Sequence, residues 1–425
     1  MNTIVVPTPV MSSRRSRLSE LAADRIVQDG VFAGFIVLSR IPANLGTGGA
    51  AIGLALMVLY AAIRLDQCRA VMLRCRLQLA YPVLALASIL WAVHPLVTGR
   101  AAVQMAITAF AGLLLSQAAR PRAVLLGLFC AFAGYTVASF LIGHTRPDGV
   151  TGAPALFGLG GEAKNYFADS AATGALLSLA MAAVCLERRA FAATIGCAMT
   201  ILFCILATHQ ARSAGALASL VLAAGLMLIL LIMRSRSPTA KALVSLALLA
   251  GLILGAVFFE QLLVIVQQVA AKDAGLTGRG YLWYRAEFIV AERPWLGTGY
   301  FGFWTPENPD AIGFWRYFDI RQEGTAFSFH NSYIQTMVET GYLGLVVLVG
   351  TWIAGVLALL RRFVITPSLP TCFWLSYLVL QLSKSPVEPI RPAALVAPTV
   401  MLFAALGFGW FPFGRSARAG SSKSG

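Results

Sequence analysis

The feature that most constrains this chain is a succession of apolar runs, most of them long enough to cross a membrane. A helix that spans the roughly 30 Å hydrocarbon core needs about 20 mostly apolar residues. Such runs, some of them shorter, lie at 27–43, 45–64, 77–95, 100–118, 123–143, 166–186, 190–207, 214–233, 240–260, 340–360, 370–384 and 392–412. The sequence therefore predicts an all-α, polytopic membrane protein with about 12 transmembrane helices, of which the first is the weakest because Arg40 interrupts it.

Charged residues make up only 12% of the chain, whereas about 25% is usual for a soluble domain. This shortage excludes a soluble enzyme and a disordered chain. The formal net charge of +15 would suggest nucleic-acid binding, but the Lys and Arg residues lie in short clusters between apolar runs. Such clusters are typical of membrane-protein loops, so we expect no nucleic-acid partner.

Most of the 33 Lys and Arg residues fall in the two tails and in alternate loops, which indicates that these parts face the cytoplasm. We expect a cytoplasmic tail over 1–26, transmembrane helices 1–9 over 27–260, a long periplasmic loop over 261–331, helices 10–12 over 332–413 and a cytoplasmic tail over 414–425. The cations of the opposite face, such as Lys384 and Arg391, run against this rule, and each needs a local reason.

Motifs for metals and nucleotides are missing from the sequence. The four histidines have no two-His metal spacing, and the sequence has neither an Asp-x-Asp pair nor a Gly-Lys-Ser/Thr phosphate loop. No cysteine lies in 261–331, so we expect no disulfide there. The sequence thus predicts no metal, no cofactor and no use of ATP or nucleotide sugars.

Three places put polar side chains at the outer edge of the membrane. They are the start of the sixth span with Lys164, Asn165 and Asp169, the turn between spans seven and eight with Arg212 and Ser213, and the long loop with Arg279, Arg285, His330 and Asn331. Guanidinium groups match phosphate oxygens in pairs, and a histidine accepts a proton from a hydroxyl near neutral pH. Together they predict an outward-facing basic site for an anionic, membrane-borne and already activated substrate.

Several of these residues also have a structural interpretation. The alternatives are contact with lipid phosphate for Arg212, a hydrogen-bonding role in the loop for His330, an ordinary helix start for Lys164 and Asn165, and, for Arg285, a lipid headgroup or an ion pair with Glu287, Glu292, Asp319 or Glu323.

Aromatic residues crowd the long loop between 281 and 318, which favours a position at the lipid headgroups. We expect an amphipathic helix over about 281–292, lying on or dipping into this interface. Gly297 and Gly299, which follow Pro294, predict a tight turn.

The many spans, the Ser/Arg turn, the "GR…W…A…PWLGTGY" pattern and the "HN" before the next span resemble the O-antigen ligase and polysaccharide-polymerase superfamily. Within this superfamily, the sequence is most similar to the exopolysaccharide polymerases of alphaproteobacteria, and the motifs cover roughly residues 150–350. The resemblance implies a metal-independent glycosyltransferase of GT-C-like fold in the bacterial inner membrane. Its donor would be a glycan on undecaprenyl diphosphate, at the periplasmic face.

The resemblance also implies roles for the candidate residues. Arg212 and Arg279 would hold the diphosphate as it leaves, and His330 would deprotonate the acceptor hydroxyl. The substrate-binding residues would be Lys164, Asn165, Arg285 and Asn331. A single displacement of this kind inverts the anomeric carbon.

Two other functions remain open from the sequence. A ligase would use the same chemistry but transfer the finished glycan to lipid A core or to a protein. A 12-helix transporter or flippase would use intramembrane acids, to which Asp169 and Glu339 come nearest. Besides the lipid-linked donor and the glycan acceptor, the expected partners are membrane lipids, a chain-length regulator and export proteins.

Overall fold

The computed structural model describes residues 24–41, 45–147, 152–160, 163–259, 261–262, 264, 278–320 and 327–412. Most of the two expected tails, and the parts of the long loop at 265–277 and 321–326, lie outside the described residues.

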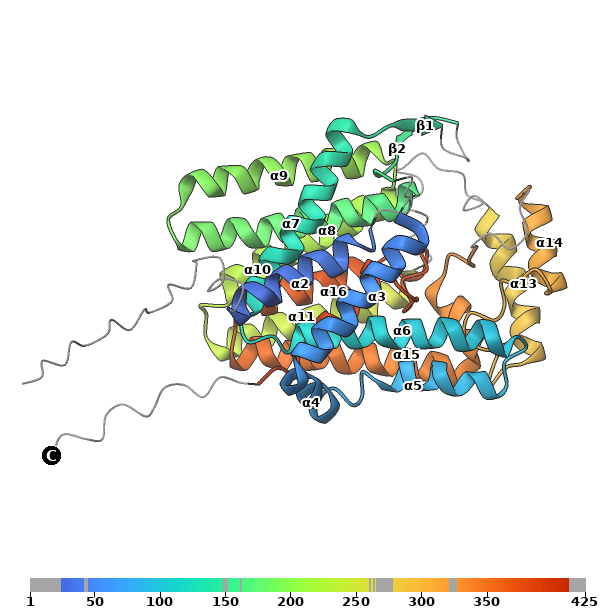
Figure 1. The fold of residues 1–425 in the computed structure, drawn as a ribbon. Coiled ribbons are helices and arrows are strands. Elements are labelled where there is room, and N and C mark those ends of the chain that lie inside the picture. The colour runs from blue at the N-terminus through green and yellow to red at the C-terminus, as the bar shows by residue number, and fades with distance from the viewer. Residues whose placement is uncertain are drawn as a thin grey trace, which may run out of the picture.

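Long apolar helices form the body of the molecule (Figure 1). Eight described helices are long and apolar enough to cross a bilayer: α3 (Gly46–Ile63), α6 (Pro95–Ser116), α7 (Pro121–Ile142), α8 (Lys164–Glu187), α9 (Phe191–Gln210), α10 (Ala214–Met233), α11 (Pro238–Val257) and α15 (Ser332–Ile365). The chain is a helical multi-pass membrane protein. The expected count of about 12 spans is not established, because only eight described helices reach this length.

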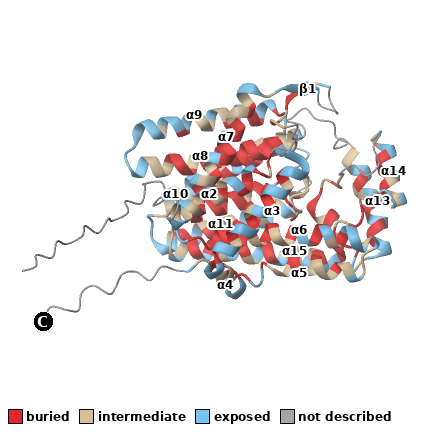
Figure 2. Ribbon diagram, in the orientation of Figure 1, coloured by how far each residue is buried: buried red, intermediate tan, exposed pale blue. Residues whose placement is uncertain are grey.

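The other expected spans are shorter helices. They are α2 (Arg25–Leu38), α5 (Ala80–Ala87) with the short η2 (Ser88–Leu90), α16 (Leu369–Leu382) and α17 (Ala397–Phe408), and α4 (Leu65–Arg74) follows α3. Buried residues concentrate inside the bundle (Figure 2). Almost every residue of α16 and α17 is buried. These two helices therefore pack against protein on all sides, and their apolar sequences serve the protein interior as well as lipid. Between them runs the α16–α17 connection, residues 383–396.

A break in α15 holds the long loop against the bundle. Gly341 has φ 64°, and a side chain there would lie 2.2 Å from the backbone of Trp295. The Tyr342 N–H donates to the Pro294 carbonyl across this close approach. Gly297 and Gly299 also have positive φ, so the tight turn predicted from the sequence is confirmed.

The helix predicted over about 281–292 is confirmed as α13 (Arg279–Glu292), and α14 (Pro309–Tyr317) follows it. Both lie at one end of the bundle (Figure 1). Leu282, Ala286, Ile289 and Val290 form a buried stripe on α13. They pack with aromatic residues of the same loop in a small second core, which includes Phe303, Phe314, Trp315 and Phe329. Three of the aromatic residues expected at the lipid headgroups, Phe303, Phe314 and Trp315, are thus buried in protein, and for these three the expectation was wrong.

A two-stranded sheet departs from the all-helical expectation. β1 (Thr145–Pro147) pairs antiparallel with β2 (Pro154–Leu156), and Thr145 lies opposite Leu156. This hairpin lies at the same end of the bundle as α13 and α14 (Figure 1).

Candidate functional site

Glu388, in the α16–α17 connection, brings together three residues that are distant in sequence. Its Oε1 accepts hydrogen bonds from Arg279 Nη2 at 3.0 Å and from Asn165 Nδ2 at 3.2 Å. Its Oε2 lies 3.7 Å from Nδ1 of His330. Arg279 Nη1 also donates to the Val387 carbonyl at 2.6 Å. Arg279, His330 and Asn165, which we selected from the sequence, thus surround one carboxylate.

Backbone and side-chain hydrogen bonds fix this arrangement. Trp283 on α13 donates through Nε1 to the Phe329 carbonyl at 2.8 Å, which places α13 beside the residue that precedes His330. Ser332, the first residue of α15, donates its N–H to the Ser385 carbonyl and its hydroxyl to the Glu388 carbonyl. The start of α15 and the α16–α17 connection are therefore tied together next to His330.

The electrostatic balance favours an ionised Glu388. Burial alone would raise the pKa of this carboxyl, but the neighbouring His330 and Arg279 outweigh the burial and lower its pKa below the ordinary value. The side chains of Arg279, Glu388 and His330 keep 17%, 20% and 31% of their surface exposed. The cluster is thus partly shielded and still reachable by a ligand.

The turn at Arg212 is close to the cavity beside this cluster, but its guanidinium makes another contact. Arg212 is exposed, has φ 51° and donates through Nε to the Pro154 carbonyl of β2 at 2.9 Å. The next residue, Ser213, lines the same cavity as Glu388. Of the two arginines and the histidine expected to converge, the described contacts gather Arg279 and His330, and Arg212 holds the hairpin instead.

The remaining candidates occupy different environments. Lys164 is the first residue of α8, as expected from the sequence. Arg285 Nη2 lies 3.6 Å from Oδ1 of Asp310 on α14. Asp310 was not among the ion-pair partners expected for Arg285, and one that was, Glu323, lies outside the described residues. The Asn331 side chain caps α15 by accepting from the N–H groups of Tyr333 and Ile334, which gives it a structural role.

Two buried ion pairs explain two of the cations that ran against the orientation rule, Lys384 and Arg391. Lys384 Nζ contacts Asp169 on α8, which also accepts a hydrogen bond from Gln381 at 3.1 Å. Arg391 Nη2 lies 2.9 Å from Glu339 on α15. Asp169 and Glu339, the two acids that a transporter function would have used, are therefore paired with cations of the α16–α17 connection.

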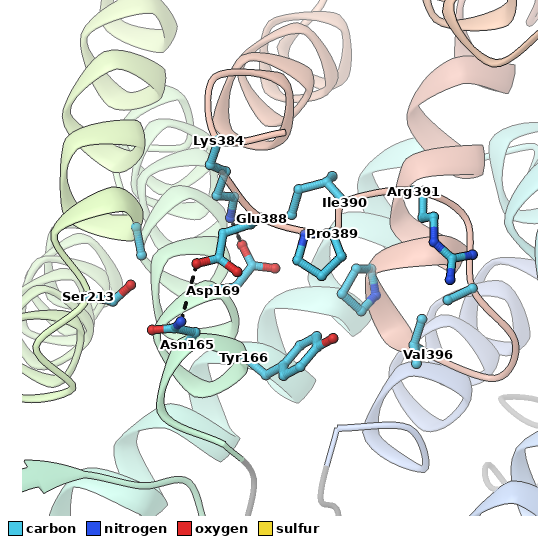
Figure 3. Close-up of a pocket in the computed structure, with 13 residues that line it drawn as sticks. Asn165, Tyr166, Asp169, Ser213, Lys384, Glu388, Pro389, Ile390, Arg391 and Val396 are labelled. Atoms are coloured by element: carbon cyan, nitrogen blue, oxygen red, sulfur yellow. Dashed lines mark hydrogen bonds and ion pairs between the residues drawn. The ribbon is translucent and has the colours of Figure 1, made fainter. Parts of the chain in front are cut away.

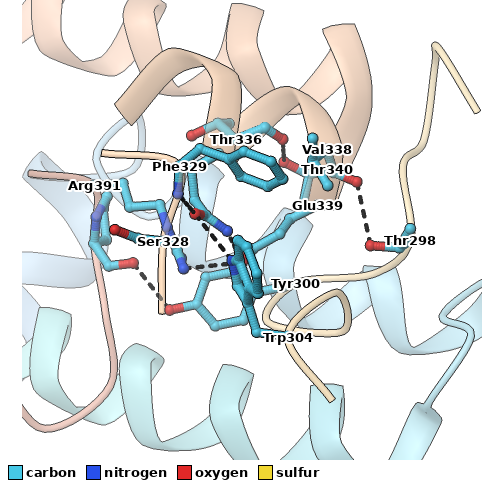
Figure 4. A network of polar contacts seen from close by, with 12 residues as sticks. Thr298, Tyr300, Trp304, Ser328, Phe329, Thr336, Val338, Glu339, Thr340 and Arg391 are labelled. Carbon is cyan, nitrogen blue, oxygen red and sulfur yellow. Dashed lines mark hydrogen bonds and ion pairs between the residues drawn. The ribbon is translucent and has the colours of Figure 1, made fainter. Parts of the chain in front are cut away.

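The Arg391–Glu339 pair is part of a larger polar network (Figure 4). Gln335 donates to Glu339 at 2.8 Å and accepts from the Phe329 N–H at 3.0 Å. The Arg391 guanidinium also lies 4.6 Å from the centre of the Phe301 ring. This network connects α15, the long loop and the α16–α17 connection behind the Glu388 cluster.

Loss of one partner of the Asp169–Lys384 pair should destabilise the protein strongly. We expect Lys384→Met to lower the free energy of unfolding by about 3–5 kcal/mol, because it leaves a buried carboxylate without its cation. The double variant Asp169→Asn, Lys384→Gln should lose much less, since it removes both charges. Thermal unfolding of the purified proteins in the same detergent measures the difference, and equal losses would contradict the ion pair.

Sequence reasoning missed Glu388, although signals for it were present. The segment from Lys384 to Arg391 is a short polar stretch between two apolar runs, with cations on the side where they are least expected. An acid among such cations is a candidate partner for a positive site. Nothing in the sequence connects it to residues more than 50 positions away.

Part of the chain matches a known protein family. Residues 197–349 match the family described as O-antigen ligase. This matched range is similar to an O-antigen ligase domain. The resemblance to the O-antigen ligase and polysaccharide-polymerase superfamily is therefore confirmed. The matched residues include Arg212, Arg279 and His330, whereas Asn165 and Glu388 lie outside the matched range.

A relative supports the same superfamily. The chain is 25% identical over 285 residues to the exopolysaccharide production protein ExoQ of Rhizobium meliloti. This similarity covers 67% of the chain and 65% of the relative, so slightly less than two thirds of the relative's length is spanned.

Proposed function

We propose that this protein is a membrane glycosyltransferase that polymerises oligosaccharide repeat units carried on undecaprenyl diphosphate. The reaction would take place at the periplasmic face of the inner membrane, in a fold similar to that of GT-C enzymes. The observation that carries the proposal is the sharing of Glu388 by Arg279 and His330. The similarity to an O-antigen ligase domain and the exopolysaccharide production protein among the relatives support the same chemistry.

In the proposed reaction, a hydroxyl oxygen of the acceptor glycan attacks the anomeric carbon of the donor. The bond from that carbon to the diphosphate oxygen breaks, and its electron pair leaves with undecaprenyl diphosphate. His330 accepts the hydroxyl proton through Nε2, because its Nδ1 faces Glu388. The configuration at the anomeric carbon inverts in this single displacement.

Arg279 would stabilise the negative charge that grows on the leaving diphosphate. A guanidinium has five N–H donors, and Arg279 uses one for a hydrogen bond to Val387 and one for a hydrogen bond to Glu388, so donors remain for phosphate oxygens. Ionised Glu388 would orient both Arg279 and His330. Arg212 would reach the diphosphate from the neighbouring turn in exchange for its contact with Pro154.

The purified protein in lipid nanodiscs, supplied with undecaprenyl-diphosphate-linked repeat units from its host, tests the proposal. We expect a ladder of lipid-linked products, with yields that do not change when EDTA is added. In cells, deletion of a polymerase leaves single lipid-linked repeat units, whereas deletion of a ligase leaves long lipid-linked polymer. The match to the O-antigen ligase family makes the ligase the second candidate. No transfer to any acceptor would contradict both.

Arg212→Lys should distinguish a phosphate clamp from a simple positive charge. An ammonium cannot make the two parallel hydrogen bonds of a guanidinium, so we expect about a tenfold lower kcat/KM for the lipid-linked donor. Arg316→Lys, at an arginine of α14 that does not line the cavity, serves as the matched control. An unchanged kcat/KM in Arg212→Lys would restrict Arg212 to its contact with the hairpin.

A further inference from the structure

A cavity opens beside Glu388, between α8, α10 and the α16–α17 connection (Figure 3). Its lining divides into two kinds of surface. Asn165, Asp169, Ser213, Lys384 and Glu388 bring hydrogen-bonding groups to one side, and Tyr166, Pro389, Ile390 and Val396 bring a ring and apolar groups to the other.

The charges that line the cavity are balanced. Asp169 is paired with Lys384, Glu388 with Arg279, and Arg391 with Glu339. A site for phosphate needs an excess of positive charge, which this lining does not offer. The cavity therefore favours a neutral ligand that has many hydrogen-bonding groups.

Arg391 does not offer its charge to a ligand either. It is 8% exposed and pairs with Glu339. Its guanidinium lies 5.6 Å from the centre of the Tyr300 ring and 4.6 Å from the centre of the Phe301 ring. Arg391 is therefore held by protein partners and supplies no free cation for a phosphate.

We infer that this cavity is a subsite for one sugar ring of the glycan, which deepens the proposed function and rests on it. A sugar ring has a rim of hydroxyls that donate and accept hydrogen bonds, and an apolar face of C–H groups. The polar side of the cavity fits the rim, and the half-exposed Tyr166 ring fits the face. Asn165 and Ser213 bring an amide and a hydroxyl to the polar side.

The subsite adjoins the reacting groups. Glu388 Oε1 accepts from Asn165, which lines the cavity, and from Arg279, which does not. A sugar held in the cavity is therefore separated from the Arg279–His330 pair by a single carboxylate. This position suits the ring that forms or loses the glycosidic bond better than a ring farther along the chain.

Direct binding to the full-length protein in nanodiscs tests the inference without turnover. The probe is the soluble oligosaccharide repeat unit released from the host's own exopolysaccharide, observed by saturation-transfer NMR. Tyr166→Ala should weaken its affinity about tenfold, and Tyr166→Phe should restore it, because the phenylalanine keeps the ring face. Tyr284→Ala, an exposed tyrosine of α13, should have no effect.

Inorganic pyrophosphate is the second probe. Its affinity should be unchanged in Tyr166→Ala, because the cavity is not the diphosphate site. If the oligosaccharide bound equally well to wild type and Tyr166→Ala, or if pyrophosphate lost affinity in that variant, the sugar subsite would be refuted.

Steady-state kinetics then identify which glycan supplies the ring. An increase in KM for the soluble acceptor alone in Tyr166→Ala assigns the ring to the acceptor, and an increase for the lipid-linked donor alone assigns it to the donor. A fall in kcat with both KM values unchanged would overturn the subsite. Oligosaccharide binding that depends on Tyr166 without any glycosyl transfer would refute the proposed function and leave the sugar subsite standing.

Discussion

Replacement of Glu388 by glutamine is expected to lower the turnover of lipid-linked donor about 100-fold, which is the order of effect seen when general base catalysis is disturbed. Glutamine keeps the size of the side chain but removes the charge that orients Arg279 and His330. Without this charge the imidazole loses its electrostatic partner at Nδ1, and the guanidinium loses an ion pair. Product formation by the purified variant, measured against time, gives the turnover number.

The control for this variant is Glu292→Gln, an exposed acid at the end of α13. It changes the net charge of the same region equally and should leave turnover within about twofold of wild type, as surface substitutions usually do. Normal turnover in Glu388→Gln would show that the carboxylate only holds the fold.

The lowered pKa of Glu388 also gives a sign for the pH dependence of stability. A carboxyl whose pKa is lower in the folded state stabilises the protein fully above its unfolded pKa, here 4.5, and less as the pH falls through the folded value. As the pH falls below about 5, the unfolding temperature of wild type should therefore fall by more than that of Glu388→Gln. Unfolding temperatures of both proteins across this range measure the difference.

The sequence predicted the features that depend on local patterns. Apolar runs identified the membrane helices, the aromatic-rich stretch at 281–292 indicated α13, and two glycines after Pro294 identified a turn. Residue type and position at the outer edge selected Arg279, His330 and Asn165, which the fold brings to one carboxylate. Each of these signals is contained in a few neighbouring residues.

What the sequence could not predict depends on packing between distant segments. Glu388 reaches Arg279 across 109 positions and Asn165 across 223, and no local pattern encodes such a contact. The run at 392–412 is apolar enough to be counted as a span, yet it holds a helix of 12 residues that the protein buries. Hydropathy reports whether a residue avoids water, and it does not distinguish lipid from protein as the alternative.

The placing of Arg212 illustrates the same limit. Its sequence position predicts a short turn between two apolar helices, and the structure puts it between α9 and α10. The direction of its side chain depends on the hairpin strand at Pro154, which the sequence did not suggest. The turn that holds a residue is therefore easier to predict than the contact that its side chain makes.

Replacement of His330 by alanine is expected to lower turnover by about 10²–10⁴-fold, because the acceptor hydroxyl then loses its base. His330 has φ 49°, a left-handed conformation that suits histidine and asparagine better than alanine, so His330→Asn, which also removes the base, serves as the second variant that keeps the course of the loop. Affinity for the lipid-linked donor should change little. Donor consumption and donor binding, measured separately on the purified variant, distinguish these two effects.

Arg279→Ala should differ from His330→Ala in a diagnostic way. Arg279 is proposed to contact the diphosphate before and during its departure, so its loss should weaken donor binding as well as lower turnover by about 10²–10³-fold. His144→Ala, an exposed histidine that precedes the hairpin, controls for the general loss of an imidazole. If His330→Ala weakened donor binding and left turnover of the bound donor intact, His330 would be a binding residue, and the base in this reaction would have to be sought elsewhere around the cavity.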